Sequence, residues 1–213
     1  MKVVSVNVSL PIEVEFRGEL ISTGIFKKPV AGGVIVNKSH LSGDGQADLT
    51  VHGGEDKAVY AYSLDHYEYW QRVLRRDTLP PGQFGENLTI ARLDEATSCI
   101  GDHWQIGTAI FAITQPRMPC HKLGIRFNDM NMPKLFSRAR RNGVYLKVLR
   151  EGIVATGDEV KLLQRGVDAV YVQEILQAYM SPKLAASKQA YRRVLRVSEL
   201  SNEWRAKIAA RLG

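Results

Sequence analysis

A short loop near the middle of the chain brings a thiol together with several cationic side chains, a combination that can ligate a soft metal or attack an electrophile. The loop, residues 114–123, reads TQPRMPCHKL. Two prolines restrict the backbone on either side of Arg117, and His121 and Lys122 follow Cys120. Cationic neighbours favour the thiolate, which is the form of cysteine that binds metals. Cys120 is therefore the leading candidate ligand, although many cysteines serve only as small buried apolar residues.

A glycine-rich segment offers a second candidate site. Residues 43–60 read GDGQADLTVHGGEDKAVY and contain four glycines. Glycines allow tight turns and a close approach of backbone N–H groups to a ligand, and Asp48, Thr50 and His52 share one face if the centre is extended. This arrangement could bind an anion or a polar heterocycle. A glycine-rich hairpin with exposed polar residues would explain the same segment.

A third segment, residues 82–89, reads GQFGENLT and follows two prolines. The Asn87 amide offers both a donor and an acceptor for reading the edge of a ligand. As a motif it is weak, because a turn into a strand at residues 88–90 explains it equally well.

The other cysteine and the other histidines show no such pattern. Cys99 lies in a strand-like run without cationic neighbours and is interpreted as structural, and a disulfide between the two cysteines is not expected in a reducing compartment. His40, His66 and His103 lack metal-ligand spacing, so we interpret them as surface or packing residues.

Short strands are expected to carry these loops. Apolar and polar residues alternate at 4–8, 12–16 and 144–148, a pattern typical of strands with one buried face. One helix is expected to interrupt the strands, with Ser63 as its cap and an apolar face made of Tyr67, Trp70, Val73 and Leu74. Many short strands separated by glycine-containing turns favour a barrel or a sandwich.

Three amphipathic helices are predicted after about Asp168, where the period of the apolar residues changes. Their apolar faces comprise Val172, Ile175, Leu176 and Tyr179, then Ser187, Tyr191, Val194 and Leu195, and last Leu200, Trp204, Ile208 and Leu212. Helices this short need to pack on each other or on the strands. We therefore predict two domains, a strand-rich one at residues 1–163 and a three-helix one at residues 164–213.

The composition is that of a soluble globular protein. The chain has 213 residues, 45% of them hydrophobic and 24% charged, with no apolar run long enough for a membrane span and no signal peptide. We expect a cytoplasmic location and no membrane partner. The formal net charge is +7, and residues 165–213 hold nine Lys and Arg against four Asp and Glu. A basic helical tail could contact nucleic acid, but a solvated basic face is the more common explanation.

The three segments together resemble the MOSC domain, named for the C-terminal domain of molybdenum cofactor sulfurase, and in particular its stand-alone bacterial members with a three-helix tail. The resemblance is carried by DLTVHGG at 48–54 with AVYAY at 58–62, by FGENL at 84–88, and by QPR at 115–117 with PCHKL at 119–123. Their order and spacing match, and so does the tail, so the resemblance covers nearly the whole chain.

The resemblance implies a fold, a cofactor and a set of site residues. The implied fold is mainly β with additional α structure, a partly closed β-barrel followed by the three-helix module. The implied cofactor is the molybdenum cofactor, with Cys120 as metal ligand and catalytic residue, since a soft thiolate suits this metal. The cofactor would be surrounded by Asp48, His52, Gly53, Gly54, Asn87, Gln115, Arg117 and Cys120, with Lys28 as a further ligand of its phosphate.

Members of this type are associated with the reduction of N-hydroxylated compounds, including hydroxylamino nucleobases and amidoximes, and so with detoxification of such bases. The family is also associated with pyridoxal phosphate. The sequence shows no flavin, haem or iron–sulfur motif, so electrons for a small-molecule substrate would come from a separate donor protein. A cofactor carrier or sulfur-handling protein without reductase activity is the alternative. The sequence leaves open whether the protein is a monomer or a homodimer.

Overall fold

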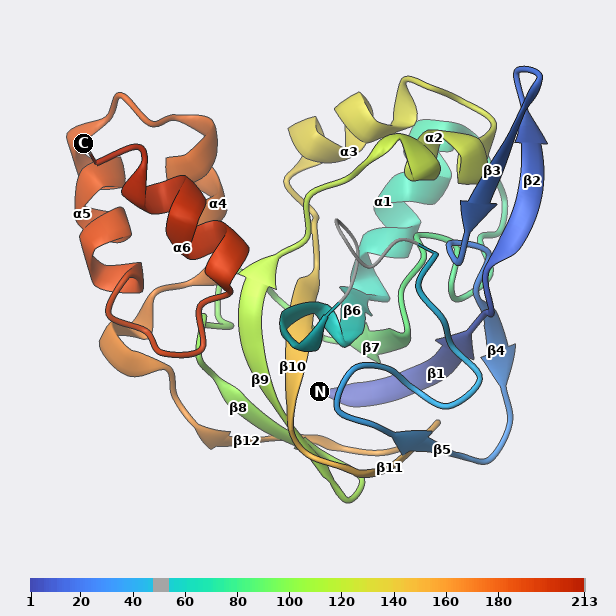
Figure 1. Ribbon diagram of the computed structural model, residues 1–213, viewed down its shortest axis with the longest axis horizontal. Coiled ribbons are helices and arrows are strands. Elements are labelled where there is room, and N and C mark those ends of the chain that lie inside the picture. Colours follow the sequence, from blue (N-terminus) through green and yellow to red (C-terminus); the bar gives the residue numbers. More distant parts are fainter. Residues whose placement is uncertain (48–53, 213) are drawn as a thin grey trace.

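The computed structural model describes residues 1–47 and 54–212, which fold around one large sheet (Figure 1). The strands of the protein are β1 (Lys2–Val8), β2 (Ile12–Phe16), β3 (Glu19–Thr23), β4 (Lys28–Val30), β5 (Gly33–Val36), β6 (Val59–Ser63), β7 (Leu88–Ala91), β8 (His103–Ile106), β9 (Ala109–Pro116), β10 (Val144–Arg150), β11 (Gly152–Ala155) and β12 (Val160–Gln164). Its α-helices are α1 (Asp65–Leu74), α2 (His121–Phe127), α3 (Met132–Ala139), α4 (Val172–Met180), α5 (Ala185–Val194) and α6 (Asn202–Ala209), with short 3-10 helices η1 (Glu55–Lys57) and η2 (Val167–Ala169).

The large sheet has eight strands in the order β12-β8-β9-β10-β6-β7-β1-β4, and its two ends curl towards each other. The Val3 N–H donates to the Asp158 carbonyl at 2.9 Å, the Gly157 N–H donates to the Val3 carbonyl at 2.9 Å, and the Val160 N–H donates to the Met1 carbonyl at 3.1 Å. These bonds join the start of β1 to the segment that enters β12. The sheet is therefore a partly closed barrel of the kind predicted, with β2–β3 and β5–β11 as separate two-stranded ribbons.

Two of the predicted strands bury their side chains differently from the alternating pattern. In β1, Ser5 and Asn7 are as buried as Val6, and the Asn7 side-chain amide donates to the Thr89 hydroxyl at 3.1 Å. Both faces of β1 are covered, because loops pack on the face that an open sheet would expose to water. In β2, Ile12 is 46% exposed, because the β2–β3 hairpin projects from the body (Figure 1). The prediction of one buried face is wrong for β1 and correct for β10. In β2 it is only partly correct, because Val14 and Phe16 are half-buried while Ile12 is exposed like Glu13 and Glu15.

Helices α1, α2 and α3 pack together over one end of the sheet around an aromatic cluster, with Tyr62, Trp70, Phe84 and Phe136 at its centre (Figure 1). The Trp70 and Phe136 rings stack with their centroids 5.6 Å apart. Helix α1 was predicted, but its predicted cap is wrong, because Ser63 belongs to β6. Val73, which was predicted on the apolar face of this helix, is 43% exposed. Helices α2 and α3 were not predicted. Apolar residues alternate in the seven residues of α2, so its sequence resembles a strand and only packing on the cluster makes it helical.

The three helices of the tail, α4 to α6, are confirmed where the apolar period placed them. They lie together on the side of the sheet opposite the β2–β3 hairpin (Figure 1). Their buried residues, including Ile175, Tyr191 and Trp204, belong to the same apolar cluster as Phe111 and Val148 of the sheet. The division into domains at 1–163 and 164–213 stays a prediction. In the described ranges no helix is both long and apolar enough to cross a membrane.

Candidate functional site

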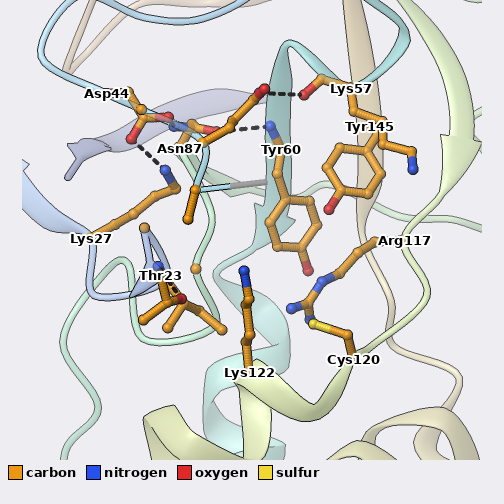
Figure 2. A pocket seen from close by; sticks show the side chains of 16 residues that line it. Thr23, Lys27, Asp44, Lys57, Tyr60, Asn87, Arg117, Cys120, Lys122 and Tyr145 are labelled. Carbon is orange, nitrogen blue, oxygen red and sulfur yellow. Dashed lines mark hydrogen bonds and ion pairs between the residues drawn. The ribbon is translucent and has the colours of Figure 1, made fainter. Parts of the chain in front are cut away.

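A cleft opens where the cysteine loop faces the segments that follow β3 and precede β6 (Figure 2). It encloses about 630 Å³ of empty space, part of it open to solvent, and Cys120 is one of its lining residues. Four of its lining side chains are basic and one is acidic: Lys27, Lys57, Arg117 and Lys122, with Asp44. The excess of cations makes this cleft suited to an anionic ligand.

Cys120 is half-buried at the N-cap position of α2, with an extended backbone (φ −120°, ψ 177°). Figure 2 shows its Sγ beside the guanidinium of Arg117, and the Cys120 thiol is among the groups that raise the pKa of that guanidinium. The extended conformation is the usual one for the residue that precedes the first turn of a helix. Cys99 is fully buried elsewhere, and no disulfide joins these two described residues. Burial separates the two cysteines as predicted, but the expected absence of a cationic neighbour is wrong for Cys99, because the Arg165 guanidinium donates to its Sγ at 3.3 Å.

Arg117 is the most unusual side chain of the cleft, because it is a buried cation. The residue is 5% exposed, and its guanidinium carbon lies 5.0 Å from the centroid of the Tyr60 ring and 5.1 Å from that of Phe136. Its Nη1 is buried and has no hydrogen-bond partner in the described part of the chain. Buried donors are nearly always paired in folded proteins, so this orphaned N–H indicates that an acceptor from a ligand belongs here.

The backbone of Arg117 is held by hydrogen bonds, even though its guanidinium does not use all of its hydrogen-bond donors within the described residues. The Arg117 N–H donates to the Gly143 carbonyl at 3.3 Å, and the Asn142 side-chain amide donates to the Arg117 carbonyl at 2.6 Å. The Tyr60 hydroxyl donates to the Asn142 carbonyl at 2.8 Å, and the Glu95 carboxylate accepts the Gly143 N–H at 2.8 Å. A turn before β10 therefore fixes the direction of Arg117 into the cleft.

The two tyrosines next to Arg117 do not neutralise it. Tyr60 and Tyr145 come from β6 and β10, and their ring centroids are 5.3 Å apart. Burial raises the pKa of each hydroxyl, well above its usual value for Tyr60, so both stay protonated at neutral pH. The positive charge of Arg117 therefore has no anionic partner among these neighbours.

A buried ion pair forms the opposite wall. Lys27 and Asp44 are 8% and 6% exposed and form a salt bridge, while burial lowers the pKa of the lysine and Asp44 partly restores it. Asp44 also accepts the Ser9 N–H at 2.9 Å and the Asn87 side-chain N–H at 2.8 Å. The Asn87 Oδ1 accepts the Tyr60 N–H at 3.0 Å. Asn87 lines the cleft as expected, but its amide ties three segments together and leaves little capacity for a ligand.

The other predicted site residues fall in several places. Lys28 is exposed on β4 and does not line the cleft, whereas its neighbour Lys27 does. Gly54, at a φ of 79°, rims an adjoining hollow that shares Asp44 with the cleft. Gln115 lies behind the lining, 2% exposed and paired with Tyr145 across β9 and β10, and its Oε1 has no partner in the described residues. Three predicted residues lie outside the described residues: Asp48, His52 and Gly53.

Several lining residues were not predicted, and the sequence held a signal for only some of them. Tyr145 alternates with Val144 and Leu146 in β10, so the sequence pattern placed its side chain on the face of the strand that Val144 and Leu146 do not occupy. Asp44 was visible in the glycine-rich segment but had no assigned role. Nothing local distinguishes Lys27 from Lys28, because the choice depends on where β4 begins.

The basic residues of the tail are largely engaged within the fold. Arg193 and Arg196 pair with Glu174 and Asp168 at 2.7 Å, and Arg205 donates to the Leu195 and Val197 carbonyls at 2.6 Å. Charges used in this way are poorly placed to contact nucleic acid phosphates. Contacts of this kind are also made by Arg165, Lys207 and Arg211, so most of the tail's basic residues bond within the described fold.

The glycine-rich segment from residue 48 onwards, the Asn87 segment and the cysteine loop fall within one match to a family model. Residues 48–161, more than half of the chain, match the model of the MOSC domain. The chain belongs to the MOSC domain family. This MOSC match includes Arg117 and Cys120 but not Lys27 or Asp44, so an earlier segment supplies one wall of the cleft.

Relatives of this MOSC protein include bacterial and fungal sequences. The chain is 39% identical over 204 residues to the uncharacterized protein YflK of Bacillus subtilis (strain 168), covering 96% of this chain and 91% of YflK. The crystal structure of YiiM from Geobacillus stearothermophilus superimposes with a TM-score of 0.83 at 32% identity, covering 100% of this chain and 99% of that one. A protein of Gibberella moniliformis named "Reductase" is 32% identical over 167 residues, which are 76% of this chain and 30% of the fungal protein.

Proposed function

We propose that this protein is a molybdenum-cofactor-dependent reductase of N-hydroxylated small molecules, with Cys120 as the metal ligand. The observation that carries the proposal is a half-buried thiol beside a buried guanidinium whose Nη1 has no hydrogen-bond partner among the described residues. Membership of the MOSC family supports the cofactor, and the relative named reductase supports the reaction class.

The residues present fit such a cofactor. In the described ranges no group of three or more His, Cys, Asp and Glu residues could hold a metal ion. A metal bound to Cys120 would therefore need its other ligands from a cofactor. A pterin dithiolene brings two sulfur ligands and a phosphate. The orphaned Nη1 of Arg117 and the ammonium groups of Lys27 and Lys122 are the donors that an anionic cofactor requires.

When bound, the cofactor supplies two-electron redox chemistry at the metal. Within the chain, Cys120 binds as the thiolate, Arg117 and Lys27 bind anionic oxygens, and Asn87 keeps the walls in register. Asp48, His52, Gly53, Gly54 and Gln115 remain proposed members of the same site, and Lys27 replaces Lys28 in it.

The reaction takes up two electrons and two protons, cleaves the N–O bond and releases water. Tyr145 lines the cleft and holds a proton on its hydroxyl, since burial raises the pKa of that group. It is therefore placed to orient the substrate oxygen by a hydrogen bond. The electrons come from a separate donor protein, which the chain would contact outside the cleft.

The decisive experiment compares protein made in a host that synthesises the cofactor with protein from a host that cannot. Molybdenum content and reduction of an amidoxime by an artificial electron donor are measured for the wild type, Cys120→Ser and Cys99→Ser. We expect metal and activity only with the cofactor-producing host, loss of turnover in Cys120→Ser with an unchanged unfolding temperature, and retention in Cys99→Ser. Full activity of Cys120→Ser would refute the mechanism, while bound molybdenum without turnover of any N-hydroxylated substrate would indicate a carrier.

A further inference from the structure

A histidine and a glutamate lie buried behind the turn that holds Arg117, and neither of them lines the cleft. His66 comes from the first turn of α1 and Glu95 from the loop after β7, and they are 7% and 4% exposed. The His66 Nε2 lies 2.9 Å from each oxygen of the Glu95 carboxylate. His66 was interpreted as a surface or packing residue, because nothing in the sequence connects it with a glutamate 29 residues away.

A contact on the other side of the imidazole shows which of its nitrogens carries the proton. The Arg141 Nη1 lies 3.0 Å from the His66 Nδ1, and a guanidinium can only donate a hydrogen bond. The Nδ1 therefore accepts, and the single proton of the neutral ring is on Nε2, which donates it to Glu95. Burial alone would raise the pKa of the Glu95 carboxyl, but the hydrogen bonds from His66 and Gly143 hold that pKa below its ordinary value. Glu95 is thus a carboxylate at neutral pH.

The turn before β10 is held at two points by this pair. At residue 141 the arginine side chain donates to His66, and at residue 143 the Gly143 N–H donates to the Glu95 Oε1 at 2.8 Å. The Gly143 carbonyl accepts the Arg117 N–H at 3.3 Å. Only two hydrogen bonds therefore separate the Glu95 carboxylate from the backbone of the buried arginine, and a shift of the turn would move Arg117 with it.

We infer that His66 and Glu95 are positioning residues of the anion-binding cleft, which fix the turn at residues 141–143 so that Arg117 presents its unpaired Nη1 to the ligand. Both act through Arg117 and neither touches the ligand. The inference rests on the proposed role of Arg117 in binding an anion. It concerns binding alone, so it does not depend on whether the protein is a reductase.

Two substitutions of similar size separate positioning from simple electrostatics at Glu95. Glu95→Gln removes the negative charge but keeps an oxygen that can accept the Gly143 N–H, whereas Glu95→Met removes both. Loss of a negative charge behind an anion site should strengthen anion binding in both variants if electrostatics alone matters. Positioning predicts weaker binding in Glu95→Met only, by roughly two- to tenfold, which is the equivalent of one hydrogen bond.

The test measures binding of inorganic pyrophosphate to cofactor-free protein by titration calorimetry, at a temperature where circular dichroism shows every variant to be folded. We expect Glu95→Gln to bind at least as tightly as the wild type and Glu95→Met to bind more weakly. In an Arg117→Met background, Glu95→Met should cause no further loss, because Glu95 acts only through Arg117. The matched control is Glu199→Met, which removes a carboxylate paired with His103 at 3.1 Å elsewhere in the fold and should leave binding unchanged.

His66→Phe tests the other member of the pair and takes the place of Glu95→Met if that variant does not fold. Phenylalanine keeps a ring beside Tyr62, whose centroid lies 5.4 Å from that of His66, but offers no donor to Glu95 and no acceptor to Arg141. Its affinity for pyrophosphate is expected to fall by about twofold or more. In the wild type, the nitrogen chemical shifts of labelled histidine in mildly alkaline buffer should show the Nε2–H tautomer for His66.

Equal binding by Glu95→Met and Glu95→Gln would overturn the inference, as would an unchanged affinity in His66→Phe or an Nδ1–H tautomer of His66. A further loss from Glu95→Met in the Arg117→Met background would also overturn it, since the two residues would then act independently. If the wild type binds no pyrophosphate, or if Arg117→Met binds it equally well, the proposed role of Arg117 fails and this inference fails with it. Loss of binding in Arg117→Met but not in Glu95→Met contradicts the inference alone.

Discussion

Replacing Arg117 by methionine should abolish anion binding without weakening the fold, which is unusual for a fully packed side chain. A buried charge without a partner costs about 3–5 kcal/mol. The contacts with the Tyr60 and Phe136 rings offset this by about 0.5–2 kcal/mol each. Methionine has a similar length and packs well against aromatic rings, so little packing is lost.

These magnitudes predict a free energy of unfolding for anion-free Arg117→Met that lies between about 1 kcal/mol below and about 4 kcal/mol above that of the wild type. For a chain of this size each kcal/mol raises the unfolding temperature by about 2–4 °C. The measurement is urea unfolding followed by the fluorescence of the three buried tryptophans, Trp70, Trp104 and Trp204. Pyrophosphate binding by the same variant should fall at least tenfold, because the cleft loses the most deeply buried cation among its described lining residues.

Arg165→Met is the matched control, since the same substitution there should have the opposite effect on stability. Arg165 is 44% exposed and its guanidinium donates to the buried Asp102 carboxylate at 2.9 Å. Its removal leaves that carboxylate without a cation, and we expect a loss of roughly 1–3 kcal/mol with no change in pyrophosphate binding. A loss of more than about 1 kcal/mol in Arg117→Met would refute the idea that Arg117 is retained for binding at the expense of stability.

Three further predictions concern the surroundings of the cleft. His66 and Gly143 hold the pKa of Glu95 below its ordinary 4.5, against the effect of burial. The stability that the Glu95 carboxylate contributes is therefore present above pH 4.5 and is lost as the pH falls through the lowered pKa. Glu95→Gln should flatten the acid limb of a plot of unfolding free energy against pH. Lys27→Met should lower the free energy of unfolding in urea by roughly 3–5 kcal/mol, because Asp44 loses its buried partner. Lys28→Met should lower it by less than about 0.5 kcal/mol, and equal effects of the two substitutions would contradict the assignment of the two lysines. Gly143→Ala should lower the unfolding temperature and weaken pyrophosphate binding together, since a Cβ at this φ of 66° would lie 2.4 Å from a carbonyl oxygen of β6; full binding in a less stable variant would show that the turn does not hold Arg117.

Much of the fold could be predicted from the sequence because its signals are local. Helices α4 to α6 were located by apolar residues three and four apart, and β10 by strict alternation, since each of these elements buries a single face. Helix α2 and the second buried face of β1 could not be predicted. Both depend on what packs against them from distant parts of the chain, the aromatic cluster for α2 and the covering loops for Asn7.

The residues of the candidate site can likewise be divided into those that the sequence indicated and those that it did not. Cys120 and Arg117 could be named in advance because prolines, a thiol and cations lie within one loop. Lys27 and Asp44 could not, because their importance comes from meeting each other in a buried wall 17 residues apart in sequence. Tyr145 was placed on the correct face of its strand, but only the folded structure shows that this face borders the cleft and not the solvent.

The closure of the sheet has a consequence for how the protein is made. The backbone of Met1 and Val3 bonds to residues 157–160, and β1 also pairs with β7 and β4, so the first strand has no partner among its immediate neighbours in sequence. At about 5–20 residues per second, roughly 8–30 s pass during synthesis before the closing segment follows the first strand out of the ribosome. Until then Met1 and Val3 lack the backbone partners that residues 157–160 provide. The valine-rich start of β1 is thus open to pairing with other chains before the barrel closes.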